Sequence, residues 1–142
     1  SVGAFDPLRQ VPGLTFSEVA MQPGKPQGSG RVGGVPLLAF PGNPVSVFVS
    51  FLLFGRPLLQ LLAGTSATSS VRRVVAGADW TSPPGRRQYL PARLVGEVAT
   101  PVHRLGSGSH LIASLPLADA LVVVGEDVTQ VRAGETLDAV EV

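Results

Sequence analysis

The stretch Val35-Pro36-Leu37-Leu38-Ala39-Phe40, followed directly by Pro41-Gly42-Asn43-Pro44, decides the fold prediction for this chain. The apolar run lies between Gly34 and Pro41, which is typical of a strand buried on both faces. Asn43 is a favoured N-cap residue and proline is tolerated at the first helical position, so a helix should begin here. A strand, a tight turn and a helix in this order point backbone N–H groups beyond the end of the strand and favour an anion site. The alternative is that Asn43 caps the helix for stability alone.

The predicted helix runs from Pro44 to Ala63, with Gly64 as its stop signal, and nearly all of its faces are apolar. About 20 apolar residues can span a bilayer, so a membrane helix is one alternative. Gly55-Arg56-Pro57 places a charge and a kink near the middle of the stretch. This interruption favours a core helix packed under a sheet, and we expect no membrane contact.

The segments on either side of the helix differ in pattern. Residues 1–34 are rich in Gly and Pro and indicate loops that connect short elements, among them a short strand over Leu14 to Met21. Residues 64–70 are small and polar, as in a linker. Beyond the linker, short period-two segments separated by Gly, Pro and Asp predict a small β-barrel or sandwich. The predicted strands are 71–76, 87–95, 97–104, 120–124 and 137–142.

Composition excludes several classes of function. The 11 basic and 10 acidic residues are spread along the chain and form no basic stripe, so we expect no nucleic-acid partner. The absence of cysteine excludes disulfides, thiolate metal sites and a cysteine nucleophile. Together with an N-terminus unlike a signal peptide, it favours a cytoplasmic location. The chain begins at Ser1 and its single methionine is Met21, so we expect a fragment of a longer protein.

Two charged residues near the start are candidates for chemistry. Lys25 is the single lysine of the chain and lies between two prolines in Met21-Gln22-Pro23-Gly24-Lys25-Pro26. A compact ammonium can act as a point charge on a tetrahedral oxyanion; the alternative is a solvated loop lysine. Asp6 is suited to holding a divalent metal beside phosphate-binding loops, although it can equally cap a turn with Pro7.

A later loop, Gly106-Ser107-Gly108-Ser109-His110, offers hydroxyl groups and an imidazole. Ser109 is a candidate donor to an oxyanion, or an N-cap for a helix over 111–115, and both roles are compatible. We interpret His110 and His103 as structural or exposed, because no carboxylate at local spacing orients either ring. Trp80 and Tyr89 are interpreted as barrel packing.

Three motifs in this order resemble the molybdopterin molybdenumtransferases, which include bacterial MoeA and the E domain of gephyrin. The segment 19–26 resembles the Lys-Pro-Gly-Lys-Pro loop of that family, and Phe40-Pro41-Gly42-Asn43-Pro44-Val45-Ser46 resembles its Leu-Pro-Gly-Asn-Pro-Val-Ser turn, the most specific of the three. Gly108-Ser109-His110 and the closing Gly134-Glu135-Thr136-Leu137 resemble its C-terminal barrel. The match covers nearly the whole chain.

The resemblance implies an α/β fold class: the C-terminal part of a molybdopterin-binding three-layer α/β domain over residues 1–66, followed by a small β-barrel domain over residues 67–142. Ser1-Val2-Gly3 would be the end of a phosphate-binding Gly-Gly-Val-Ser-x-Gly motif. The implied reaction inserts molybdate into adenylated molybdopterin with Mg²⁺ and releases AMP. The implied enzyme is a homodimer, with molybdopterin adenylyltransferase as a further partner, and we expect the fragment to be inactive alone.

Residue roles follow from the same resemblance. Asp6 corresponds to a catalytic, metal-binding acid, and Lys25 to a catalytic cation. The positions that correspond to substrate-binding residues are Ser1, Gly3, Gln22, Gly24, Pro26, Pro41, Gly42, Asn43, Ser46 and Ser109.

The chain departs from the family pattern at two of these sites. Gln22 stands where the family often has a lysine, and Pro91 stands where it usually has a molybdate-binding arginine. On a strand, residues 91 and 93 share a face, so Arg93 is a candidate substitute.

Two other functions remain open at this stage. The related molybdopterin adenylyltransferases share the α/β domain, although the barrel after the linker argues against them. A non-catalytic scaffold module of the gephyrin E-domain type is the alternative from a different class. Sequence upstream of Ser1 would discriminate between an enzyme and a scaffold.

Overall fold

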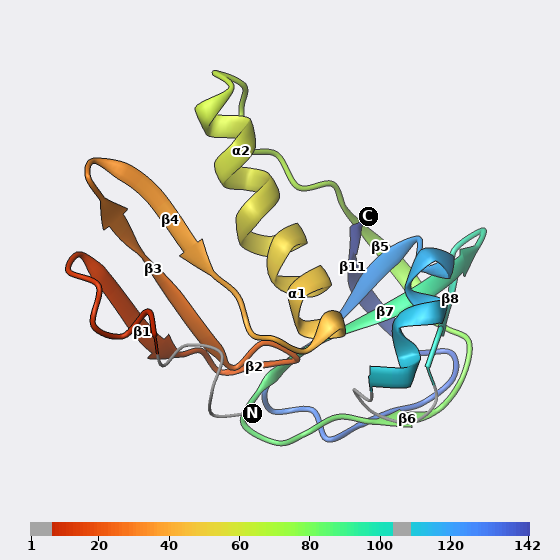
Figure 1. The fold of residues 1–142 in the computed structure, drawn as a ribbon. Helices are drawn as coiled ribbons and strands as arrows, with labels where there is room; N and C mark the ends of the chain where they lie inside the picture. Colours follow the sequence, from red (N-terminus) through yellow and green to blue (C-terminus); the bar gives the residue numbers. More distant parts are fainter. Residues whose placement is uncertain (1–6, 104–108) are drawn as a thin grey trace.

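The N-terminal part of the chain forms a small antiparallel sheet (Figure 1). The computed structural model describes residues 7–103 and 109–142, and for residues 109–111 it describes the backbone alone. Strands β1 (Leu14–Glu18), β3 (Pro26–Val32) and β4 (Val35–Ala39) pair in the order β1-β3-β4. The expected strand over Leu14 to Met21 is confirmed as β1 and a short β2 (Met21–Gln22), whereas β3 lies in a segment interpreted as loops.

The run 35–40 is a strand, but the prediction that both of its faces are buried is wrong. Strand β4 lies at the edge of its sheet, Val35 is 64% exposed, and Ala39 is the buried residue of the strand. It pairs with β3 through a two-residue turn at Gly33-Gly34, where both φ angles are positive. Positive φ angles at both positions favour glycine, and such a turn joins antiparallel neighbours directly. The run is therefore the second strand of a hairpin.

The predicted helix over 44–63 is confirmed, as is its N-cap. Asn43 Oδ1 accepts hydrogen bonds from the backbone N–H groups of Val45 (3.0 Å) and Ser46 (3.3 Å). The helix comprises α1 (Pro44–Ser50), a π-helical segment η1 (Phe51–Gly55) and α2 (Arg56–Leu62). Pro57 cannot donate to the carbonyl four residues earlier, and its ring crowds that carbonyl. The extra residue of the π segment accommodates this, because the Arg56 N–H donates to Phe51 instead.

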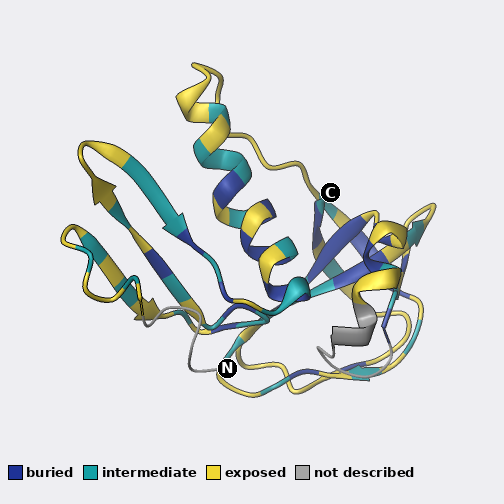
Figure 2. Cartoon of the chain, viewed as in Figure 1, coloured by how far each residue is buried: buried dark blue, intermediate teal, exposed yellow. Residues whose placement is uncertain are grey.

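The helix buries one side and leaves the other exposed. Val45, Ser46, Val49, Ser50 and Leu52 are buried, whereas no residue of α2 is. By length and composition alone the helix would also fit a membrane span, with 19 residues and a mean hydropathy of 1.8. Figure 2 shows buried residues on one side of the helix and exposed ones on the other. The buried side packs on the barrel, as expected for a core helix, but the exposed side is apolar as well.

The second half of the chain forms the expected small β-barrel. Strand β7 pairs with β8, β8 with β5, β5 with β11, and β11 with β9, and β9 pairs back with β7, so the sheet closes on itself. The bounds are β5 (Val71–Ala76), β7 (Arg87–Val95), β8 (Val98–Pro101), β9 (Ala120–Val124) and β11 (Thr136–Glu141). Two short strands, β6 (Trp80–Thr81) and β10 (Gln130–Val131), form a separate ribbon, and η2 (Ser109–Leu117) is a 3₁₀ helix.

Strand alternation divides the barrel side chains between two cores. Val122 points inward with Val74 and four buried alanines, and Trp80 packs against the same cluster. Small residues suit the narrow interior of such a barrel. The next residue along β9, Leu121, points outward and packs with Met21, Val49, Leu52 and Val140. The helix and β2 are therefore held to the barrel by a shared hydrophobic core.

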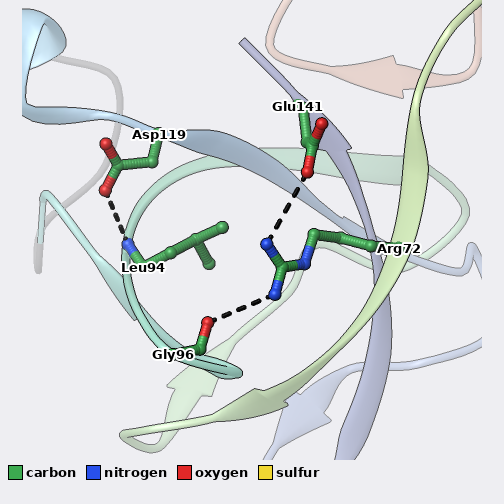
Figure 3. A network of polar contacts seen from close by, with 5 residues as sticks. All are labelled: Arg72, Leu94, Gly96, Asp119 and Glu141. Carbon is green, nitrogen blue, oxygen red and sulfur yellow. Dashed lines mark hydrogen bonds and ion pairs between the residues drawn. The ribbon is translucent and has the colours of Figure 1, made fainter.

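Polar contacts tie the ends of the barrel strands together (Figure 3). The Arg72 guanidinium lies 3.6 Å from the Glu141 carboxylate and donates to the Gly96 carbonyl at 3.3 Å, which links β5, β11 and the β7–β8 turn. The Leu94 N–H donates to Asp119 at 2.8 Å, which links β7 to the residue before β9. These contacts connect strands that are distant in sequence and support the closed ring.

The described residues show only part of the expected fold class. They show the barrel, one helix and an antiparallel sheet, and they do not show the three layers of a molybdopterin-binding α/β domain.

Candidate functional site

A pocket of about 870 Å³ opens where the N-terminal part, the helix start and the barrel meet. Gln22 and Pro23 line it from β2 and the residue that follows, Val45 from the first turn of α1, and all other lining residues lie within 78–103. They include one acidic residue, Asp79, and Trp80, Ser82, Gln88, Tyr89, Pro91, Thr100 and His103. Segments that are far apart in the sequence thus share one cavity with apolar walls and several polar groups.

Strand pairing brings Gln22 to this pocket. Strand β2 runs parallel to the start of β7, with Met21 opposite Arg87 and Gln22 opposite Gln88. The Arg87 N–H donates to the Ala20 carbonyl at 2.9 Å and extends the pairing by one bond. The Gln22 side chain accepts a hydrogen bond from Arg86 Nη1 at 2.8 Å. The position of Gln22 is therefore fixed by the barrel and not by its own loop.

The motif at the start of the helix reaches the pocket through one residue, Val45. Pro41 and Ser46 are buried, Gly42 is exposed, and Asn43 caps the helix. Asn43 therefore caps the helix, which was the alternative to anion binding. Its role toward an anion stays a prediction.

Lys25 carries a partner that local sequence did not indicate. Its ammonium lies 3.0 Å from Glu18 Oε2, with 42% of the lysine side chain and 75% of the glutamate side chain exposed. Neither Lys25 nor Pro26 lines the pocket. Gln27 fixes this loop to the helix, since its Nε2 donates to the Gly24 carbonyl at 2.8 Å and to Ser50 Oγ at 2.7 Å. The catalytic role of Lys25 remains a prediction.

Pro91 and Arg93 lie on the same face of strand β7, but their surroundings differ. Pro91 is buried and lines the pocket, whereas Arg93 is exposed and does not. Arg93 lies opposite Thr100 of β8. Its proposed substitution for the family arginine stays a prediction, since reaching the pocket would require the long side chain to extend along the strand.

His103 and Ser82 line the pocket, and the sequence predicted neither as a site residue, since His103 was interpreted as structural or exposed. His103 is 7% exposed, and its Nδ1 lies 2.8 Å from Ser114 Oγ on η2. Ser82 is 4% exposed, and within residues 7–103 and 109–142 its buried hydroxyl has no hydrogen-bond partner. Neither residue stands in a local motif, so no sequence signal separates them from ordinary barrel residues.

The aromatic residues do more than pack. Trp80 contacts the barrel core as expected, and its indole N–H donates to Gln88 at 3.2 Å. Tyr89 packs against the core shared with the helix, and both aromatic side chains line the pocket. The pKa of Arg87 is raised mainly by a hydrogen bond with Tyr89 and secondly by the negative charge of Glu126. Arg87 Nη2 lies 3.5 Å from Glu126 Oε2, so the two residues form an ion pair on the protein surface.

Several predicted site residues lie outside what the structure describes. Ser1, Gly3 and Asp6 belong to residues 1–6, and Ser109 is described only as the first backbone position of η2. Among residues 7–103 and 109–142, no group of three or more His, Asp or Glu side chains is placed to hold a metal ion.

Comparison with known proteins identifies the barrel. Residues 73–142 match the model of the MoeA C-terminal region (domain IV). The chain belongs to the MoeA family. It is similar to molybdopterin molybdenumtransferase 2 of Mycobacterium tuberculosis, with 43% identity over 126 residues that cover 88% of this chain and 31% of that protein. It is also similar to molybdopterin molybdenumtransferase 1 of the same species, with 38% identity over 92% of this chain and 33% of that protein.

The fold agrees with solved MoeA structures. A crystal structure of the molybdopterin biosynthesis MoeA protein of Pyrococcus horikoshii superposes with a TM-score of 0.77 and 32% identity, over 91% of this chain and 32% of that chain. The chain therefore spans about a third of the length of the curated MoeA relatives that it matches. Its match includes the sheet and helix before the barrel, since 91% of the chain is covered.

Proposed function

We propose that this chain is part of a molybdopterin molybdenumtransferase, which inserts molybdate into adenylated molybdopterin and releases AMP. One observation carries the proposal: residues of separate MoeA-like motifs, Gln22 and Val45, line a single pocket with the barrel residues Pro91 and His103. Relatives at 43% and 38% identity are named for this activity. The active enzyme would require the remainder of the longer protein, with this chain supplying one wall of the site.

The proposed reaction requires a site that stabilises negative charge. Molybdate and the phosphoanhydride are both oxyanions, so preorganised donors and cations near the pocket would lower the barrier. Gln22, Thr100 and His103 offer polar groups at its wall. Lys25 would join them by leaving Glu18, at modest cost, because exposed ion pairs contribute only about 0–1 kcal/mol. We assign the catalytic cation to Lys25 on this basis.

The remaining assignments extend the same proposal. Residues 1–66 would complete a molybdopterin-binding α/β domain, and residues 67–142 would form the neighbouring barrel domain. Asp6 would bind Mg²⁺ together with the phosphates of the substrate. The other residues that we propose to contact the substrate are Ser1, Gly3, Gly24, Pro26, Pro41, Gly42, Asn43, Ser46, Arg93 and Ser109. A homodimer in the cytoplasm, supplied by molybdopterin adenylyltransferase, completes the proposal.

Molybdate-dependent release of AMP from adenylated molybdopterin tests the function in the complete protein that contains this chain. We expect release with Mg²⁺ and its loss without molybdate. Lys25→Ala should reduce the rate at least about 10-fold, as expected when a charged hydrogen-bond donor is removed from a transition state. Arg73→Ala is the matched control, because Arg73 is 64% exposed and paired with Asp138 on the barrel. No release by the unmodified protein would remove the enzymatic proposal and favour a scaffold.

A further inference from the structure

Arg86 does not itself line the pocket, but it is hydrogen-bonded to a neutral residue that does. Its Nη1 donates to Gln22 Oε1 at 2.8 Å, and Gln22 lines the pocket. The arginine is half-buried, and it immediately precedes β7, the strand to which β2 is paired. The same backbone pairing that positions Gln22 therefore also positions the guanidinium.

The charge of Arg86 is not matched by a carboxylate, unlike that of the cations around it. Lys25 is paired with Glu18, and Arg87, the next residue in the chain, is paired with Glu126. Within the described part of the chain, no acidic side chain lies within ion-pair distance of Arg86. A half-buried guanidinium with a neutral partner keeps its full charge for an additional anionic ligand.

Gln22 is oriented by the same bond. Since its oxygen accepts from Arg86, its amide NH₂ is the end that remains available to the cavity. Ser82 adds a buried hydroxyl to the same pocket, and this hydroxyl has no partner among the described residues. Buried polar groups in proteins are nearly always hydrogen-bonded, so this one is consistent with a polar ligand.

We propose that Arg86, from its position behind Gln22, binds an anionic substrate that enters this pocket, with Gln22 as the positioning residue that holds the guanidinium. The ligand is a multiply charged oxyanion, either molybdate or the diphosphate of the adenylated substrate. Arg86 thereby places a positive charge beside Gln22, which is itself uncharged. The inference rests on the proposed function and adds to it a binding residue outside the three MoeA-like motifs.

Calorimetric titration of the complete protein with sodium molybdate, and separately with inorganic pyrophosphate, tests the proposal and distinguishes the two oxyanions. Arg86→Ala should weaken binding of at least one of them by about 10-fold or more, the usual effect of losing a charged hydrogen bond. Arg86→Lys keeps the charge but loses the planar fork, so its loss should be smaller. Arg73→Ala, which removes an arginine already paired with Asp138, should leave both affinities unchanged.

A second substitution separates a charge effect from a folding effect. In the Arg86→Ala background, Gln22→Lys places an ammonium at the pocket wall, and it should recover most of the lost affinity. Unchanged affinity in Arg86→Ala, in a protein whose unmodified form releases AMP, would overturn the role of Arg86 alone. A loss that Gln22→Lys does not recover, accompanied by a lower melting temperature, would also overturn it. Absence of AMP release by the unmodified protein would instead count against the proposed function.

Discussion

Gly24 has a backbone conformation that favours glycine and is also surrounded closely by other side chains. Its φ is +100°, and a Cβ at this position would lie 3.0 Å from Met21 Cε and 3.2 Å from both Gln27 Nε2 and Ser50 Oγ. We expect Gly24→Ala to reduce the free energy of unfolding by about 1–3 kcal/mol, since an L residue is strained there and its neighbours must move. Urea denaturation followed by circular dichroism measures the loss.

Gly34→Ala is the control for the crowding part of this effect. Gly34 also has a positive φ, +79°, but a Cβ at this position would face open space, with no heavy atom within 4 Å apart from its chain neighbours. Its substitution should therefore cost only the backbone strain and destabilise less than Gly24→Ala. Equal decreases in the free energy of unfolding for the two variants would show that the side chains around Gly24 move aside at no cost.

Individual site residues were only partly predictable from sequence. Gln22 was singled out by its motif, and it does line the pocket. The partners that decide the charge of the site were not visible, because Glu18 reaches Lys25 across a turn and Arg86 reaches Gln22 from 64 positions away. Local sequence reports residue types and spacing, whereas these pairs depend on how β2 docks on β7.

At the scale of elements, the helix was the most predictable part because its signals are local. The Asn43-Pro44 start and the Gly64 end are both present, and Gly64 has the left-handed φ of +76° that a helix stop favours. The sheet before the helix was less predictable. The sequence Gly33-Gly34 between short runs is a hairpin signal, but Pro26–Val32 contains two other glycines and lacks clear alternation, so β3 was missed.

The helix cap provides a prediction at this scale. Asn43→Ala removes the acceptor for the N–H groups of Val45 and Ser46 and should lower the free energy of unfolding by about 0.5–2 kcal/mol. Asn43→Asp keeps an acceptor at the same place and should retain most of the stability. Thermal melts of the two variants against the unmodified protein measure the difference. Equal melting temperatures for all three proteins would mean that tertiary packing alone fixes the helix start.

For the whole molecule, the core between the helix and the barrel is the contact that holds the parts together. Leu121 is fully buried there, against Val49 and Met21. Leu121→Ala should reduce the free energy of unfolding by about 2–5 kcal/mol, because a buried leucine is replaced by a cavity. Leu117→Ala is the control, since Leu117 is 56% exposed, and it should change stability by less than about 0.5 kcal/mol. A small loss in Leu121→Ala, measured by urea denaturation, would indicate that the helix docks only loosely.

The exposed side of the helix leads to a prediction about association. Leu59 and Leu62 lie three positions apart on α2, share one face and are 57% and 61% exposed. Exposed apolar patches on a protein surface usually mark a contact with another protein part. Since the MoeA relatives are about three times as long as this chain, we propose that the remainder of the longer protein covers this face. Residues 1–142 alone should then self-associate at micromolar concentration in sedimentation velocity experiments. The double substitution Leu59→Glu and Leu62→Glu should shift them toward monomer, whereas Val95→Glu, at a 73% exposed position on the barrel, should not. A monomeric unmodified chain would argue that this apolar face needs no cover.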